Sequence, residues 1–61
     1  MKFAALYRFA LERGYTIHKT KAYVEWIRNI DGTKGMCETL QEAYDEIHHD
    51  YEVRRNRLLQ V

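Results

Sequence analysis

A turn signal and a helix-start signal stand close together in this chain. Asp31-Gly32 is favoured in two-residue type I′ hairpin loops, because both central residues need a positive φ, which glycine adopts freely. Thr39-Leu40-Gln41-Glu42 matches a capping box, in which the Thr39 hydroxyl accepts from the Glu42 amide and the Glu42 carboxylate accepts from the Thr39 amide. Residues 33–38 have room for only one short strand, so this segment predicts a hairpin followed at once by a helix.

The helix that begins after Thr39 has a clear apolar pattern. Spacings of three, four and seven residues place its apolar side chains on one stripe, which the aliphatic part of Arg54 continues. The stripe consists of Leu40, Ala43, Tyr44, Ile47, Tyr51 and Leu58. Acidic residues stand in the first turns and arginines in the last turns, as the helix dipole favours.

The segment before the hairpin, Lys2 to Arg13, also predicts a helix. It is rich in alanine and leucine and is followed by Gly14, a residue type common at helix C-termini. The residues at helical spacing are Phe3, Leu6, Tyr7 and Ala10. The alternative is a strand that alternates through Phe3, Ala5, Tyr7 and Phe9.

Three strands are predicted between the two helices, at Tyr15–Lys19, Tyr23–Ile30 and Thr33–Cys37. The order is α-β-β-β-α, which predicts a small α+β fold with a three-stranded antiparallel sheet and helices packed on one face. A two-residue hairpin loop would place Ile27 opposite Met36. It would also place Trp26 opposite Cys37, and a longer loop that uses Gly35 would change this register.

The chain of 61 residues has room for a single domain, residues 1–61, with a small core. A core of this size supplies about 3–5 kcal/mol, and the single Cys37 cannot form an internal disulfide. We therefore expect a homo-oligomer, most simply a homodimer. One cysteine, no secretory leader and no long apolar stretch predict a cytoplasmic protein without a membrane partner.

Motifs for catalysis or cofactor binding are absent from the sequence. It has no phosphate-binding glycine loop, no G-x-S-x-G turn and no spaced pair of Cys-x-x-Cys motifs. His48 and His49 would point about 100° apart on a helix, so they cannot share a metal ion, and Glu52 and Asp45 are their expected helix-face partners. We expect Cys37 to be a buried apolar residue, and the protein to be neither an enzyme nor dependent on a metal or cofactor.

Charge is unevenly distributed, although the net charge is only +1. Residues 1–36 carry seven Lys or Arg and three acids, residues 37–53 carry six acids and no Lys or Arg, and residues 54–61 carry three arginines. The acidic residues on the helix face opposite the apolar stripe form either a solvated surface or a docking surface for a basic protein. These residues are Glu38, Glu42, Asp45, Glu46 and Glu52.

A second candidate surface combines basic and aromatic residues on the strands. Nucleic-acid surfaces use cations for phosphates and rings for stacking, whereas scattered basic residues at sheet edges also prevent edge pairing. The basic residues are Lys19, Lys21, Arg28 and Lys34, beside His18, Tyr23 and Trp26. Near-neutral net charge favours protein binding over nucleic-acid binding, because duplex-binding domains are usually strongly basic.

Helices on one side leave the other sheet face open, and we expect that face to pair with a second copy. The open face is predicted to carry Tyr15, Tyr23, Ile27 and Met36, or alternatively Val24 and Trp26. The tail that contains Leu58, Leu59 and Val61 is the other candidate for pairing.

Residues 35–47, GMCETLQEAYDEI, are similar to the strand-to-helix junction of HicB-type antitoxins. The hairpin followed by TLQEAYDEI resembles the sheet and helix of phage integrase arm-binding domains. Each resemblance covers less than half of the chain and leaves the first helix unmatched, so no functional residue is transferred. The sequence predicts a small non-enzymatic protein-binding module, an inhibitor, adaptor or regulator of the kind encoded by phages, mobile elements or small operons, with nucleic-acid binding as the alternative.

Overall fold

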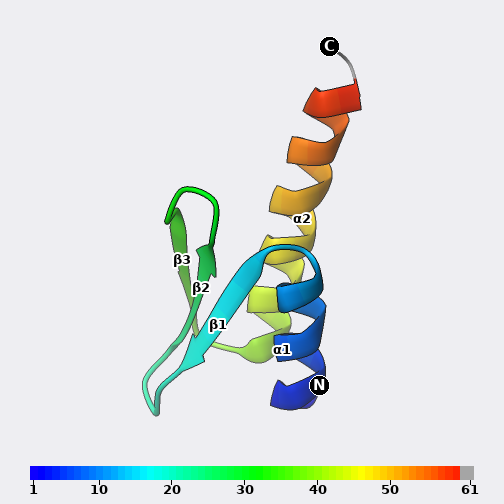
Figure 1. Ribbon diagram of the computed structural model, residues 1–61. Helices are drawn as coiled ribbons and strands as arrows, with labels where there is room; N and C mark the ends of the chain where they lie inside the picture. The colour runs from blue at the N-terminus through cyan, green and yellow to red at the C-terminus, as the bar shows by residue number, and fades with distance from the viewer. Residues whose placement is uncertain (60–61) are drawn as a thin grey trace.

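The computed structural model describes residues 1–59 and has two helices on one face of a three-stranded antiparallel sheet (Figure 1). In chain order the elements are α1 (Phe3–Glu12), β1 (Tyr15–Lys19), β2 (Val24–Arg28), β3 (Lys34–Cys37) and α2 (Leu40–Leu59). β2 lies between β1 and β3. The predicted α-β-β-β-α fold is confirmed. Within residues 1–59, neither helix has the apolar run that a membrane crossing requires.

The N-terminal segment is the predicted helix, and the alternative strand is wrong. α1 ends before Gly14, which takes the left-handed φ of 90° that glycine tolerates best. Leu6 and Ala10 are buried as predicted. Phe3 and Tyr7 are each 38% exposed, because they stand at the edge of the buried stripe, where their rings lie next to each other with the planes tilted by 39°.

The loop of the β2–β3 hairpin is longer than Asp31-Gly32 predicts. The Arg28 amide donates to the Thr33 carbonyl at 2.7 Å, so residues 29–32 form the loop, and Gly32 takes φ 77°. The Arg28 guanidinium binds the Asp31 carboxylate through Nε and Nη2, at 3.0 and 2.7 Å, and its Nη2 also donates to Thr33 Oγ1 at 2.8 Å. This side chain holds the longer loop closed.

The strand register therefore differs by two residues from the predicted one. Trp26 lies opposite Gly35, and the predicted Trp26–Cys37 and Ile27–Met36 pairs are wrong. A Cβ atom on Gly35 would lie 2.2 Å from Trp26 Nε1, so the indole fills the space that a side chain would need. Because strand faces alternate with a period of two, the shift leaves Ile27 and Met36 on the same face as predicted.

The face that carries Val24 and Trp26 is the covered one. The buried core consists of Leu6, Ala10, Tyr15, Ile17, Val24, Trp26, Cys37, Ala43 and Ile47. The prediction that Tyr15 lies on the open face is wrong, because its side chain is fully buried. Ile17 pairs with Trp26, and Tyr15, two residues earlier, shares the face of Ile17.

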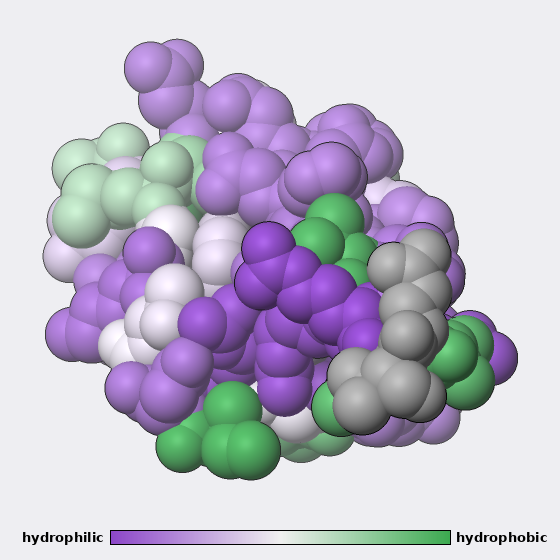
Figure 2. Space-filling view, turned by 90° about the horizontal axis from the view of Figure 1, so that it is seen from above, coloured by the Kyte–Doolittle hydropathy of each residue, from purple (hydrophilic) through white to green (hydrophobic). Residues whose placement is uncertain are grey.

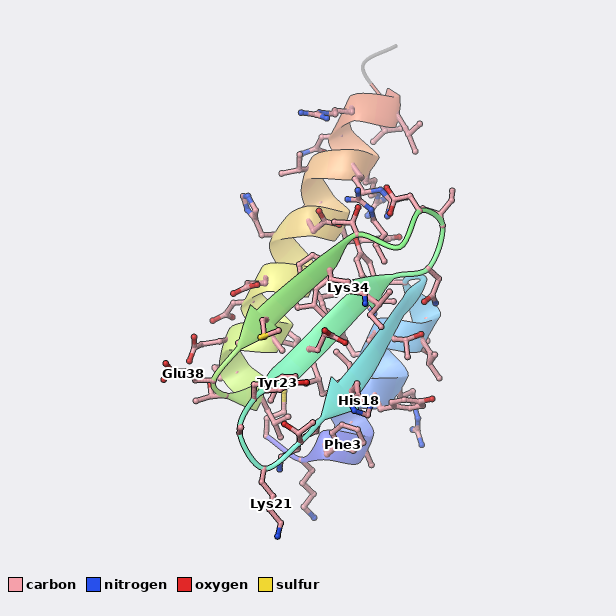
Figure 3. The ribbon with its side chains drawn as sticks, turned by 90° about the vertical axis from the view of Figure 1, so that its left-hand side faces the viewer. Phe3, His18, Lys21, Tyr23, Lys34 and Glu38 are labelled. Carbon is pink, nitrogen blue, oxygen red and sulfur yellow. The ribbon has the colours of Figure 1, made fainter. Side chains whose placement is uncertain are left out.

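Among the described residues, no helix covers the other face of the sheet (Figure 3). Tyr23 lies on this open face, as predicted, and strand alternation adds Ile27 and Met36. Met36 is 64% exposed, whereas Tyr23 and Ile27 are half-buried. Glu25 pairs with Met36 across the strands and places a carboxylate on the same face.

α2 begins at the predicted cap and extends past the rest of the molecule. The Glu42 amide donates to Thr39 Oγ1 at 3.1 Å, but the Glu42 carboxylate accepts from the Thr39 hydroxyl rather than from its amide. The helix is buried only in its first half. Residues 52–59, called the arm below, project beyond the sheet (Figure 1). Val61, predicted to belong to a pairing tail, lies outside the described residues.

Candidate functional site

An open groove lined mostly by acidic residues lies on one flank of α2. Its volume is about 380 Å³, and its lining residues are Trp26, Asp45, Glu46, His49 and Asp50. The helical residues form two adjacent pairs about one turn apart, which places them along the same flank. We call this feature the acidic groove.

Trp26 reaches the acidic groove from the sheet. Its indole passes beneath Gly35 of β3, and Nε1 donates to Glu46 Oε1 at 2.9 Å. The ring meets Tyr15 edge-on, with the two ring centroids 5.8 Å apart, and only 7% of the residue is exposed. Trp26 therefore forms the floor of the groove and positions one oxygen of the Glu46 carboxylate.

Asp50 is occupied by contacts that hold the fold together. It accepts from Arg28 Nη1 at 3.0 and 3.1 Å and from the Tyr15 hydroxyl. The second partner of Arg28 is Asp31, and this contact holds the pKa of Asp31 well below its ordinary value and raises that of Arg28. Burial, and then the bond to Asp50, raises the pKa of Tyr15. Asp50 thus joins α2 to β1 and β2.

The remaining acidic residues of the predicted surface have no cationic partner within residues 1–59. The ion pairs in that range are both made by Arg28, to Asp31 and Asp50. The exposed acids of the predicted surface, all outside these pairs, are Glu38, Glu42, Asp45 and Glu46. The structure brings Asp45 and Glu46 together at the acidic groove, whereas Glu38 lies before the helix and Glu52 is half-buried at the start of the arm.

Three groove residues were not predicted for this surface. Asp50 has a signal in the sequence, because Glu42, Glu46 and Asp50 recur every four residues and so lie on one helix flank. Trp26 has no such signal. It is distant in sequence and was predicted beside basic residues, and only the packing of β2 against α2 brings its indole to Glu46.

The predicted basic residues do not form one surface. Lys34 lies on the open face with His18, whereas Lys21 is at the tip of the β1–β2 turn (Figure 3). Lys19 and Lys21 line an open concavity of about 530 Å³ with the threonine between them. Arg28 is on the covered face in its two ion pairs, so it lies apart from Lys34 and its charge is already paired.

The adjacent histidines have partners other than those predicted. The His48 ring stacks on Tyr44 with the ring planes 5° apart, rather than pairing with Glu52. His49 lines the acidic groove, and Asp45 accepts from the glutamine four residues before it. Within residues 1–59, no three His, Cys, Asp or Glu side chains converge as metal ligands would.

Cys37 is a buried residue, as predicted. It is 5% exposed and belongs to the core. Burial, followed by a hydrogen bond with Glu46, raises the pKa of its thiol to about 12. The thiol is therefore protonated at neutral pH, which makes it a poor nucleophile.

Comparisons with models of known protein families, with curated proteins and with solved structures each found no match. Neither resemblance noted in the sequence thus extends to a family match. The geometry of the acidic groove and its surroundings is therefore the basis for a functional assignment.

Proposed function

We propose that the protein is a non-enzymatic protein-binding module and that its acidic groove takes a basic segment of a partner protein. The observation that carries the proposal is the pair of exposed carboxylates of Asp45 and Glu46, which have no cationic partner within residues 1–59 and flank the indole of Trp26. Inhibitor, adaptor and regulator are roles that binding alone can fill.

The shape of the acidic groove suits a side chain on an extended segment better than a free small molecule. It is open, and its volume of about 380 Å³ lies near the lower end of the ~300–1,000 Å³ typical of ligand pockets. Trp26 passes beneath Gly35, so the groove borders β3. The outer edge of β3 has no strand partner within residues 1–59, and a partner segment can add hydrogen bonds there while its cations meet the carboxylates.

Trp26 is the single tryptophan of the chain and supplies a direct readout of binding. A short arginine-rich peptide, titrated at low salt, should change its fluorescence, and an acidic peptide of equal length should not. Binding should weaken as salt rises, because exposed charge contacts are screened. Asp45→Lys should reduce peptide affinity by roughly tenfold or more, because the new lysine repels the arginines of the peptide. A tenfold loss of affinity corresponds to ~1.4 kcal/mol of binding free energy.

A matched control is Glu12→Lys, which makes the same charge change at an exposed position of α1. Equal loss of affinity in both variants would mean that the peptide responds to net charge alone, and the proposed function would fail. Salt-sensitive binding of duplex DNA or RNA tighter than the nonspecific ~10⁻⁴–10⁻⁶ M range would instead favour the nucleic-acid alternative. For identifying the partner, capture from the native host should compare the natural chain with Asp45→Lys as bait.

A further inference from the structure

The arm presents apolar and basic side chains that its own chain leaves uncovered. Leu58 and Leu59 are 76% and 74% exposed. Arg55 and Arg57 are exposed and belong to neither ion pair found within residues 1–59. From the C-terminal end of α2, most of the surface is hydrophilic and hydrophobic side chains form separate patches (Figure 2).

The same flank of α2 carries opposite charges at its two ends. The residues of this flank follow one another at intervals of four, four, three and four positions, and they are Glu42, Glu46, Asp50, Val53 and Arg57. At 100° per residue, these side chains fall within a sector of about 80°. The flank is acidic at the groove and basic on the arm, with an apolar residue between the two ends. The same flank of a second, antiparallel helix would therefore place its basic end against this acidic end.

We propose that a second copy of this chain occupies the acidic groove, with the two α2 helices antiparallel about a two-fold axis. The arm of each copy then lies in the groove of the other. When Arg57 of one copy meets Glu46 of the other, symmetry repeats the contact. Val53 falls opposite Asp50, whose charge Arg28 already satisfies. This inference rests on the proposed function, because the arm acts as the basic segment.

The same arrangement gives the exposed Leu58 a place to pack. A two-fold axis perpendicular to the plane of the helices leaves both sheets on the same side of the pair. Leu58 continues the stripe of Ile47 and Tyr51 that faces its own sheet, so in the pair it faces the other copy's sheet near Trp26. The proposed contact involves one helix flank and one groove, whereas a standard interface buries ~800 Å² per partner, so we expect association to be weak and concentration-dependent.

Charge exchange between two variants tests the proposal by sedimentation equilibrium at low salt. Glu46→Lys places like charges at both symmetric contacts, and so does Arg57→Glu. Each variant alone should lower the association constant by roughly 100-fold, about tenfold for each contact. An equimolar mixture of the two restores opposite charges at both contacts, and it should form a mixed dimer about as strong as the natural one.

Matched controls are Glu12→Lys and Arg8→Glu, which make the same charge changes at exposed positions of α1 and should leave association unchanged. Glu46→Gln removes the charge and keeps an acceptor for the Trp26 indole, so it separates lost association from lost folding. A 7.4 kDa monomer up to millimolar concentration would overturn the inference. So would a dimer that ignores both charge reversals, because its contact would then lie elsewhere, for example on the open sheet face.

The proposed function is tested separately on Arg57→Glu, which leaves the groove itself unchanged and should be monomeric. Binding of the arginine-rich peptide by this variant, with no dimer of the natural chain, would keep the proposed function and reject the inference. A natural dimer that responds to charge exchange, with no peptide binding by Arg57→Glu, would support the inference and reject the proposed function.

Discussion

The two halves of α2 belong to one continuous helix but have different surroundings. Residues 40–51, the docked half, bury Ala43 and Ile47 against the sheet, whereas the arm buries no side chain. The strands have four or five residues, or about 13–17 Å of length at ~3.3 Å per residue. The helix of 20 residues is about 30 Å long at 1.5 Å per residue. A sheet this short can cover only about half of the helix, and in the other half Arg54 still donates to the Tyr15 hydroxyl at 3.3 Å. The exposed side chains lie mostly beyond Arg54.

The strongest test of this difference removes an apolar side chain from each half. Ile47→Ala should cost about 2–5 kcal/mol of unfolding free energy, because it leaves a cavity in the core. That is comparable to the whole ~3–5 kcal/mol that such a core supplies, so much of the protein should be unfolded at room temperature. Leu58→Ala at micromolar concentration should change stability by no more than ~0.5 kcal/mol. Urea unfolding followed by circular dichroism measures both, and similar losses would show that the two halves are equally packed.

A smaller loss is expected where β3 meets the docked half. Gly35→Ala puts a Cβ atom 2.2 Å from Trp26 Nε1, so the indole must move. Overpacking of this kind costs about 1–3 kcal/mol. The displaced indole should also lose its bond to Glu46, which would shift the Trp26 fluorescence maximum. Lys34→Ala is the neighbouring control, and an unchanged spectrum for Gly35→Ala would show that the indole does not lie beneath β3.

The cap of the docked half should contribute less. Thr39→Ala removes the acceptor of the Glu42 amide and should cost about 0.5–2 kcal/mol, measured as a lower melting temperature. Thr39→Ser keeps the hydroxyl and should retain most of the stability. Because the acidic groove begins two turns later, peptide affinity per folded molecule should not change, and a loss of affinity would mean that the cap also shapes the groove.

The smallest effect at neutral pH concerns the thiol covered by the docked half. A folded pKa of about 12 for Cys37 means that its contribution to stability is complete below its unfolded value of 9.0 and is lost as pH rises toward 12. Unfolding free energy should therefore fall above about pH 9, and less steeply in Cys37→Ala. Tyr15 also has a raised pKa and adds to the fall above its ordinary value of 10.0. Identical alkaline profiles for the natural chain and Cys37→Ala would contradict the burial of the thiol.

The elements were predictable because their signals are local. The Gly14 helix end, the Thr39 cap and the alternation of the strands each act over a few residues, and they led to the α-β-β-β-α order. The hairpin register was not predictable in this way. It depends on Arg28, which binds Asp31 within the loop and Asp50 on α2 at the same time. The turn preference of Asp31-Gly32 acts only within the loop, whereas the contact of Arg28 with Asp50 joins residues 22 positions apart in the chain.

The candidate site was predictable in part for the same reason. Helical periodicity alone grouped Asp45 and Glu46 on the exposed side of α2, and the uneven charge along the chain pointed to that side. Which sheet face is covered, where the indole of Trp26 lies, and which acids remain unpaired were decided only by the tertiary structure. The alternation of side chains along a strand shows which residues share a face, but it does not show which of the two faces is buried. Ion pairs form between residues that only folding brings together. The sequence by itself therefore determined the elements and their order, whereas packing decided the covered face, the register, the acidic groove and the uncovered arm.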